Sequence, residues 1–163
     1  METIEPNRIR LKTPTYEPIG SPYGAKSKYW LWHLDEKGNW IKGQAKDDKG
    51  ELFGNHKGTD FLTPLGTPIR ACHDGFIIKA GYENIDNEKQ GFGLRIIQMF
   101  QQNGKSFMIY YGHLSKIMEG FPNGKVAVGD LIGYSGNSGR SSGPHCHVEV
   151  RDLNQTSQPV EWV

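Results

Sequence analysis

Short apolar segments separated by glycine-containing turns run through most of the chain. Alternating apolar positions predict β-strands at residues 75–81, 93–100 and 106–113, and the Asn103-Gly104 pair predicts a turn between the last two. No long stretch repeats its apolar residues with the period of an amphipathic helix. The spacing of strands and turns therefore predicts an all-β fold that is chiefly antiparallel.

The first part of the chain departs from this pattern. Residues 1 to about 19 are polar and contain three prolines, which predicts an N-terminal arm (1–20) with little regular structure before a single domain at 21–163. Residues 29–41 alternate weakly around a turn signal and predict a hairpin. Its aromatic side chains would either pack on the core or line a groove.

Length and composition narrow the classes of function. A chain of 163 residues is long enough for one domain with a sizeable core. A net charge of +1, with no block of like charges, indicates neither a nucleic-acid partner nor an acidic tail. No apolar run is long enough to insert into a membrane, and the N-terminus lacks the features of a secretory signal peptide. We therefore expect a soluble chain that is either a mature form or one that reaches its target without a signal peptide. We also expect a monomer.

A predicted strand near the C-terminus carries two histidines in alternation. His145, His147 and Glu149 face one way, and the residues between them face the other. Two imidazoles on one rigid strand face can present nitrogen ligands to a metal, although an isolated His-x-His pair is often incidental. The same alternation turns Cys146 into the core, so we expect Cys72 and Cys146 to be buried free thiols rather than a disulfide or metal ligands.

Other histidines and an aspartate could complete a metal site. His56 and Asp60 stand far upstream, and His113 follows the predicted strand at 106–113. A catalytic zinc site takes three protein ligands, from imidazole and carboxylate groups among others, and leaves a further position for water. His56, Asp60 and one histidine of the C-terminal strand would form such a set. The remaining histidines would then be available for acid–base chemistry.

The spacing of His56 and Asp60 constrains the local backbone. Residues four apart on a straight strand lie roughly 13 Å apart, whereas zinc ligands lie about 2 Å from the metal. Gly58 and the proline-containing stretch 63–68 argue against a helix here. We therefore expect a local curl that Gly58 permits. The alternative is a turn in which the two side chains only hydrogen-bond.

Two further expectations concern residues beside this set. Alternation along 106–113 places His113 on the same strand face as Phe107, Ile109 and Tyr111. Residues 135–143 are mostly small, so side-chain packing cannot hold them, and we predict a flexible wall of the site. They do not form a phosphate-binding loop, because no lysine follows the glycines and no helix signal comes next.

Three sequence blocks together resemble the zinc endopeptidases of the lysostaphin and LytM type, the M23 peptidases. The family pattern is His-x-Gly-x-Asp, then Tyr-x-His-Leu, then Gly-x-x-Gly-x-Ser-x-Gly-Pro-His-x-His, and the chain carries these blocks in order at 56–60, 111–114 and 136–147. The resemblance covers roughly residues 21–154. It implies that His56, Asp60 and His147 bind one Zn²⁺ per chain. It also implies that His113 and His145 handle protons and the developing oxyanion.

The resemblance further implies a fold and an activity. The fold would have a central sheet, a smaller second sheet and long loops bounding a groove, with residues 126–133 forming a hairpin before the last strand. The activity would be hydrolysis of peptide bonds in peptidoglycan, in the cross-bridge or stem peptide, by a metal-activated water. It would act on the bacterial cell wall, in the periplasm, outside the cell or after release by a phage. The alternative is an inactive wall-binding, regulatory or phage structural domain, although all five site positions are intact.

Overall fold

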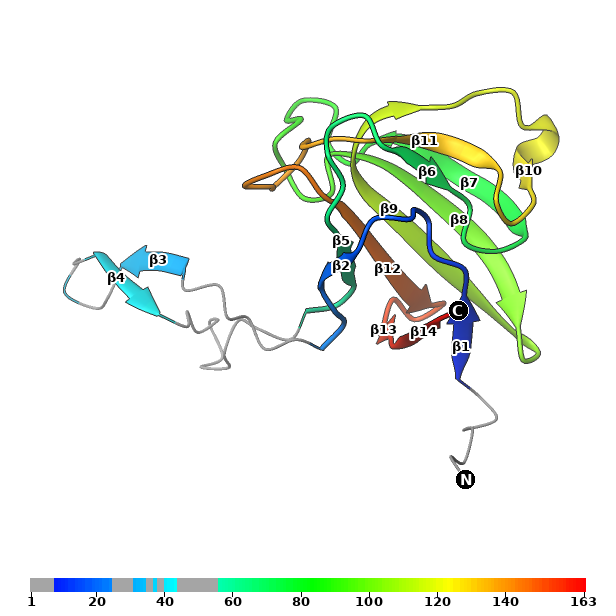
Figure 1. Cartoon of the computed structure of the whole chain (residues 1–163), viewed down its shortest axis with the longest axis horizontal. Helices are drawn as coiled ribbons and strands as arrows, with labels where there is room; N and C mark the ends of the chain where they lie inside the picture. The colour runs from blue at the N-terminus through cyan, green and yellow to red at the C-terminus, as the bar shows by residue number, and fades with distance from the viewer. Residues whose placement is uncertain (1–7, 25–30, 35–36, 38–39, 44–55) are drawn as a thin grey trace.

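The computed structural model describes residues 8–24, 31–34, 37, 40–43 and 56–163 (Figure 1). Within them, the regular elements are strands and one short 3-10 helix, η1 (Pro122–Gly124). The strands are β1 (Ile9–Leu11), β2 (Ile19–Ser21), β3 (Leu31–Leu34), β4 (Trp40–Gly43), β5 (Thr59–Phe61), β6 (Pro68–Arg70), β7 (Gly75–Tyr82), β8 (Leu94–Gln102), β9 (Lys105–Ile117), β10 (Lys125–Val126), β11 (Leu131–Ser135), β12 (Cys146–Asp152), β13 (Ser157–Gln158) and β14 (Val160–Trp162). The prediction of an all-β fold is confirmed. None of the helical structure in the described residues has the length and apolar character needed to cross a bilayer.

One antiparallel sheet organises the molecule. Its main path is β10-β7-β8-β9-β12-β5-β2, and β11 pairs with both β9 and β6. The predicted strands at 75–81, 93–100 and 106–113 correspond to β7, β8 and β9, but β9 extends to residue 117. Its early residues pair with β12 and its last residues pair with β11. Because β9 takes part in both pairings, β6 and β11 are joined to the main path and contribute to the same core.

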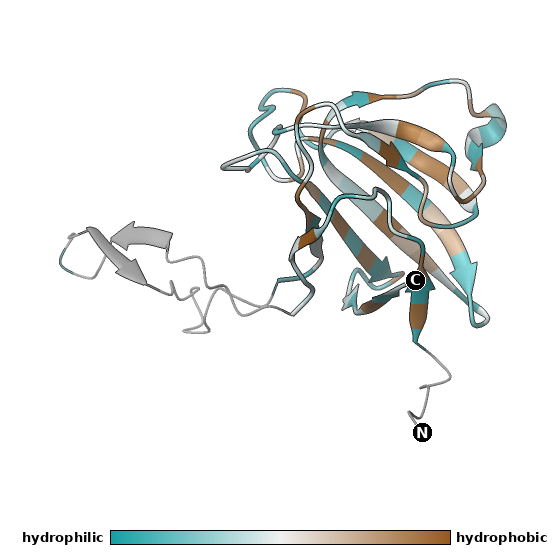
Figure 2. Cartoon of the chain, viewed as in Figure 1, coloured by the Kyte–Doolittle hydropathy of each residue, from teal (hydrophilic) through white to brown (hydrophobic). Residues whose placement is uncertain are grey.

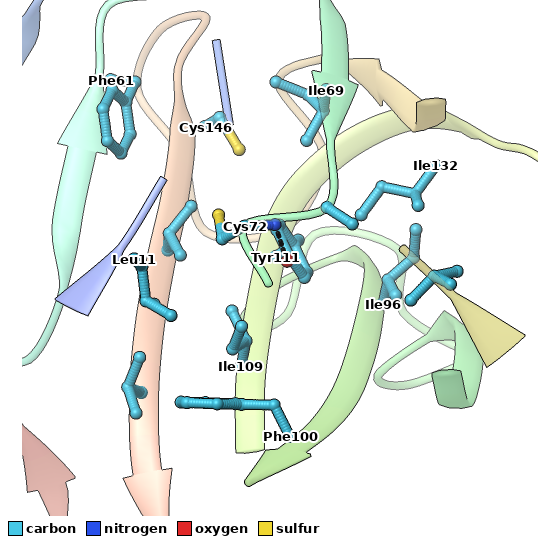
Figure 3. Close-up of a cluster of buried hydrophobic side chains, with 14 of the residues drawn as sticks. Leu11, Phe61, Ile69, Cys72, Ile96, Phe100, Ile109, Tyr111, Ile132 and Cys146 are labelled. Carbon is cyan, nitrogen blue, oxygen red and sulfur yellow. Dashed lines mark hydrogen bonds between the residues drawn. The ribbon is translucent and has the colours of Figure 1, made fainter. Parts of the chain in front are cut away.

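Apolar residues from alternate strand positions fill this core. Figure 2 shows apolar residues spaced between polar ones along the strands. On β12, Cys146, Val148 and Val150 are at most 2% exposed, as alternation predicted. Figure 3 shows Cys146 and Cys72 within the apolar cluster, where both are buried and free. The prediction of two buried free thiols is confirmed, and burial raises the pKa of Cys72 to about 12.

The described part of the N-terminal segment contributes two short strands to the folded body. β1 pairs in parallel with β14, and β2 pairs with β5. Ile9 and Leu11 are only 4% and 1% exposed and belong to the main core cluster. Within the described residues, the prediction of little regular structure therefore holds for 12–18 but not for the short strands β1 and β2. Pro14 and Pro18 lie outside both short strands, so they do not prevent the pairing.

The predicted hairpin at 29–41 corresponds to β3 and β4. They pair in antiparallel register from Leu31 opposite Gly43 to Leu34 opposite Trp40. The aromatic side chains of this hairpin lie outside the described part of the structure, so whether they pack on the core or line a groove stays a prediction.

Candidate metal centre

Three neighbouring strands place the predicted site residues. Asp60 on β5 stands directly opposite His147 on β12, and His147 stands opposite Gly112 on β9. His56 precedes β5 by three residues, and His145 precedes β12, where it bridges to Gly136. The sheet therefore brings together residues that are far apart in the sequence, such as His56 and His147, which are 91 positions apart.

The predicted metal-binding side chains converge on one point. Asp60 Oδ1 lies 2.8 Å from His147 Nδ1, and Asp60 Oδ2 lies 3.3 Å from His56 Nε2. The two histidine nitrogens are 3.3 Å apart, and one ligand atom from each of the three residues lies within 4.8 Å of the others. Two imidazole nitrogens and a carboxylate are a donor set that suits zinc. The residues present therefore fit the metal that the family resemblance implies.

Hydrogen bonds select which histidine nitrogen faces this point. His56 Nδ1 lies 3.1 Å from the carbonyl oxygen of Pro22, and His147 Nε2 lies 3.0 Å from Glu149 Oε1. Carbonyl and carboxylate oxygens only accept hydrogen bonds, so these two ring nitrogens must carry the protons. In the neutral rings, the lone pairs on His56 Nε2 and His147 Nδ1 are then left for a metal.

Two further histidines lie beside the ligand set. The ring centroids of His113 and His145 are 4.6 Å apart, and the rings of His113 and His147 are 6.1 Å apart. His113 Nδ1 lies 2.7 Å from Ser138 O, and His145 Nδ1 lies 2.8 Å from Gly143 O. Both carbonyls require a proton on Nδ1, which leaves Nε2 of each neutral ring able to accept one. His145 Nε2 is 3.8 Å from Asp60 Oδ1.

His113 reaches the site because β9 is irregular at this point. Leu114 pairs with Leu94 and Tyr111 pairs with Ile96, so two residues of β9 stand opposite one residue of β8. This is the pattern of a β-bulge, and His113 has a φ of 60°, in the left-handed region. Tyr111 and Leu114 remain in the core, while His113 turns toward the other histidines. The expectation that His113 shares a face with Tyr111 is therefore wrong.

The segment 136–143 is held by hydrogen bonds despite its small side chains. Ser138 Oγ donates to Leu114 O at 2.6 Å and accepts from Leu94 N at 3.0 Å. The backbone N–H groups of Gly139 and Arg140 donate to carbonyls of the segment 83–93. As predicted, side-chain packing does not hold this wall; backbone and hydroxyl groups hold it instead, and its flexibility stays a prediction. Ser138 therefore links the wall to the backbone next to His113.

Gly58 serves the site through its small size. Its φ is not positive, so the curl between His56 and Asp60 does not require the conformational freedom of glycine. A Cβ at this position would lie 2.6 Å from Val148 O and 2.7 Å from His147 Cε1. The expected curl is present, but the reason proposed for Gly58 was wrong: the backbone must pass close to the His147 ring.

The protonation states of the site residues depend on one another. Burial opposes ionisation of Asp60, but hydrogen bonds from His147 and His56 hold the pKa of this carboxyl well below its usual range. Burial also disfavours charge on His147, yet Asp60 and Glu149 raise the pKa of His147 to about 9. Burial lowers the pKa of His113 to about 4. At neutral pH the metal-free site therefore holds a protonated His147 between two carboxylates, next to a neutral His113.

Sequence reasoning assigned no role to two residues that contact the site histidines. Glu149 shares the strand face of His147, so alternation was the signal that could have identified it. Ser138 carried no such signal, because its contacts with Leu94, His113 and Leu114 form only in the folded chain.

Comparison with known proteins identifies similar sequences and structures. The profile of peptidase family M23 matches residues 54–160. Mpg, a DD-carboxypeptidase/endopeptidase of Neisseria meningitidis, is 38% identical over 105 residues, which are 64% of this chain and 22% of Mpg. ShyA, a peptidoglycan DD-endopeptidase of Vibrio cholerae, is 39% identical over 95 residues, 58% of this chain and 20% of ShyA. The chain thus spans about a fifth of the length of these relatives.

Solved structures are similar as well. The catalytic domain of lysostaphin from Staphylococcus simulans aligns with a TM-score of 0.55 and 32% identity, over 73% of this chain and 86% of that domain. The catalytic domain of EnpA, a prophage-encoded M23 protein from Enterococcus faecalis, aligns with a TM-score of 0.54 and 26% identity, over 80% of this chain and 94% of that one. The mainly antiparallel fold agrees with these structures. Since the profile covers more than half of the chain, this protein belongs to peptidase family M23.

Proposed function

We propose that the chain is a zinc-dependent endopeptidase that hydrolyses peptide bonds in bacterial peptidoglycan. The observation that carries this proposal is the convergence of His56, Asp60 and His147 beside the His113–His145 pair. Relatives named as a DD-endopeptidase, a glycyl-glycine endopeptidase and a DD-carboxypeptidase/endopeptidase support a wall peptide as the substrate. These names describe different bonds, so the proposal is for cross-bridge or stem peptide without choosing between them.

Each of the three residues would bind zinc through a particular atom or group. His56 would bind zinc through Nε2, His147 through Nδ1 and Asp60 through its carboxylate. Bound zinc would lower the pKa of a water molecule and polarise the scissile carbonyl group. Three protein ligands leave a further coordination position for that chemistry. One zinc ion per chain follows from this single set among the described residues.

His113 and His145 would handle protons beside the metal. Each has Nδ1 tied to a backbone carbonyl and Nε2 available at the site. The low pKa of His113, about 4, keeps its ring neutral at physiological pH, so Nε2 can accept a proton from the attacking water. A neighbouring imidazole that carries a proton can stabilise the oxyanion and then protonate the leaving amine. We assign these two tasks to the pair as a unit.

The proposed place of action is the bacterial cell wall, and the proposed active unit is a monomer. Periplasmic, extracellular and phage-released forms would all meet the same substrate. The intact set of five side chains favours an enzyme over an inactive wall-binding or regulatory relative.

Activity, metal dependence and the cleaved bond can be tested together. Purified protein is incubated with peptidoglycan, with and without chelator, and the released fragments are identified by mass spectrometry. We expect new amino termini that disappear with chelator and return with added zinc. Release of the same fragments by His147→Ala, or cleavage of glycan instead of peptide bonds, would contradict the proposal.

A further inference from the structure

A buried carboxylate next to the metal site neither binds the metal nor transfers a proton in the chemistry proposed above. Glu149 is only 3% exposed, and both of its carboxylate oxygens have partners. Oε1 accepts a hydrogen bond from His147 Nε2 at 3.0 Å, and Oε2 accepts one from Arg151 Nε at 2.5 Å. Burying a charged group is costly unless it is paired and hydrogen-bonded, so this arrangement depends on both partners.

The guanidinium group that orients Glu149 is itself held in place. Arg151 lies over the Tyr110 ring, with its Cζ atom 4.4 Å from the ring centroid. Its terminal nitrogen donates to Gln155 Oε1 at 3.2 Å, and the same oxygen accepts a hydrogen bond from Tyr110 at 2.9 Å. Glu149 therefore bonds to a cation whose position is set by stacking and by a second hydrogen bond.

The consequence for His147 follows from the two nitrogens of its ring. Imidazole can bind a metal through either nitrogen, and the hydrogen bond made by one of them determines which is left free. Glu149 is two residues beyond His147 on the same strand face, which brings its carboxylate to Nε2. On the other side of the ring, Nδ1 faces Asp60. His56 uses the opposite arrangement, with Nδ1 bonded to Pro22 and Nε2 toward the site.

We propose that Glu149, oriented by Arg151, is a positioning residue that selects Nδ1 of His147 as the metal-binding atom and fixes the plane of its ring. This inference rests on the proposed function, because it takes His147 as a zinc ligand. A carboxylate that only stabilised the fold through an ion pair would affect unfolding but not zinc affinity. The two roles can therefore be separated by measurement.

The first test compares zinc affinity by chelator competition in the wild type, Glu149→Gln and Glu149→Ala. We expect Glu149→Ala to bind zinc about 10- to 100-fold more weakly, the usual effect of losing a partner of a metal-bound histidine. Glu149→Gln should recover part of the affinity, because its amide oxygen can still accept from His147 Nε2. A matched control is Gln98→Ala, which removes a fully buried side chain bonded to Tyr111 and His73 in the core. It should lower thermal stability and leave zinc affinity unchanged.

A second test addresses Arg151. Arg151→Met keeps much of the side-chain volume and removes the charge, and we expect it to weaken zinc binding by less than Glu149→Ala does. In the Glu149→Ala background, the same change should have little further effect on affinity, since Arg151 acts through Glu149. Independent, additive losses would overturn the proposed chain of contacts.

A third test requires no variant and therefore does not depend on whether the variants fold. Nitrogen-15 NMR of the histidine rings in zinc-loaded wild type should show His147 metal-bound at Nδ1 and protonated at Nε2, and His56 the reverse. Zinc on Nε2 of His147, or wild-type zinc affinity in Glu149→Ala, would overturn this inference alone. Wild-type protein without zinc affinity, or His147→Ala with full affinity, would instead overturn the proposed function.

Discussion

Gly58→Ala is a direct test of how closely the backbone packs against the His147 ring. The new Cβ would lie 2.6 Å from Val148 O, 2.7 Å from His147 Cε1 and 2.8 Å from His147 Nε2. These separations are shorter than ordinary contacts, so either the backbone or the ring must move. The ring is hydrogen-bonded to Asp60 and Glu149, and Val148 lies within a paired strand. Neither neighbour can therefore move without losing hydrogen bonds.

The expected cost follows from overpacking a filled site, which destabilises by about 1–3 kcal/mol. For a domain of this size, that corresponds to a fall of roughly 2–12 °C in melting temperature. If the His147 ring moves, zinc affinity also falls. Each 1.4 kcal/mol of binding free energy that is lost lowers the affinity about tenfold. The φ of Gly58 is not positive, so steric contact alone produces the effect.

The assay is thermal unfolding of metal-free protein together with zinc titration against a competing chelator. Gly143→Ala is a matched control, because Gly143 is also near the site, lacks a positive φ and has no heavy atom within 4 Å of the point that a new Cβ would occupy. It should unfold near the wild-type temperature and bind zinc normally. If Gly58→Ala also behaves like wild type in both measurements, the packing argument for this position is refuted.

Three further predictions concern the site, the core and pH. His113→Ala and His145→Ala should retain stoichiometric zinc by elemental analysis and lose about 10²- to 10⁴-fold in rate. His147→Ala should lose both the zinc and the activity. If His145→Ala loses zinc and His147→Ala keeps it, the roles of these two histidines are reversed. Leu11→Ala should lower the free energy of unfolding in urea by about 2–5 kcal/mol, and an effect below about 0.5 kcal/mol would show that β1 does not contribute to the core. Because the folded pKa of His113 is depressed to about 4 from 6.5, its contribution to metal-free stability is complete above pH 6.5 and is lost as the pH falls toward 4. Denaturation across this range should show that loss, and His113→Gln should reduce it.

The sequence by itself determined the features that depend on local periodicity and on the chemistry of single residues. Alternation was sufficient to place Cys146 behind the site and His147 in front of it, because a strand has only two faces. Turn residues between apolar segments were sufficient to identify β7, β8 and β9. Histidine and aspartate side chains in three spaced blocks were sufficient to indicate a zinc site, since these are the groups that bind the metal.

Tertiary structure decided the features in which distant backbone segments meet. Alternation misplaced His113 because a bulge between β8 and β9 shifts its face, and a bulge is a property of the pairing of two strands. The strand β1 was not predicted, because it forms only by pairing with β14 at the other end of the chain. Gly58 does not have a positive φ. It must be small because β12 packs closely against it, and composition does not reveal that contact. In each case, the deciding contact is with a residue far away in sequence, and local propensity carries no information about it.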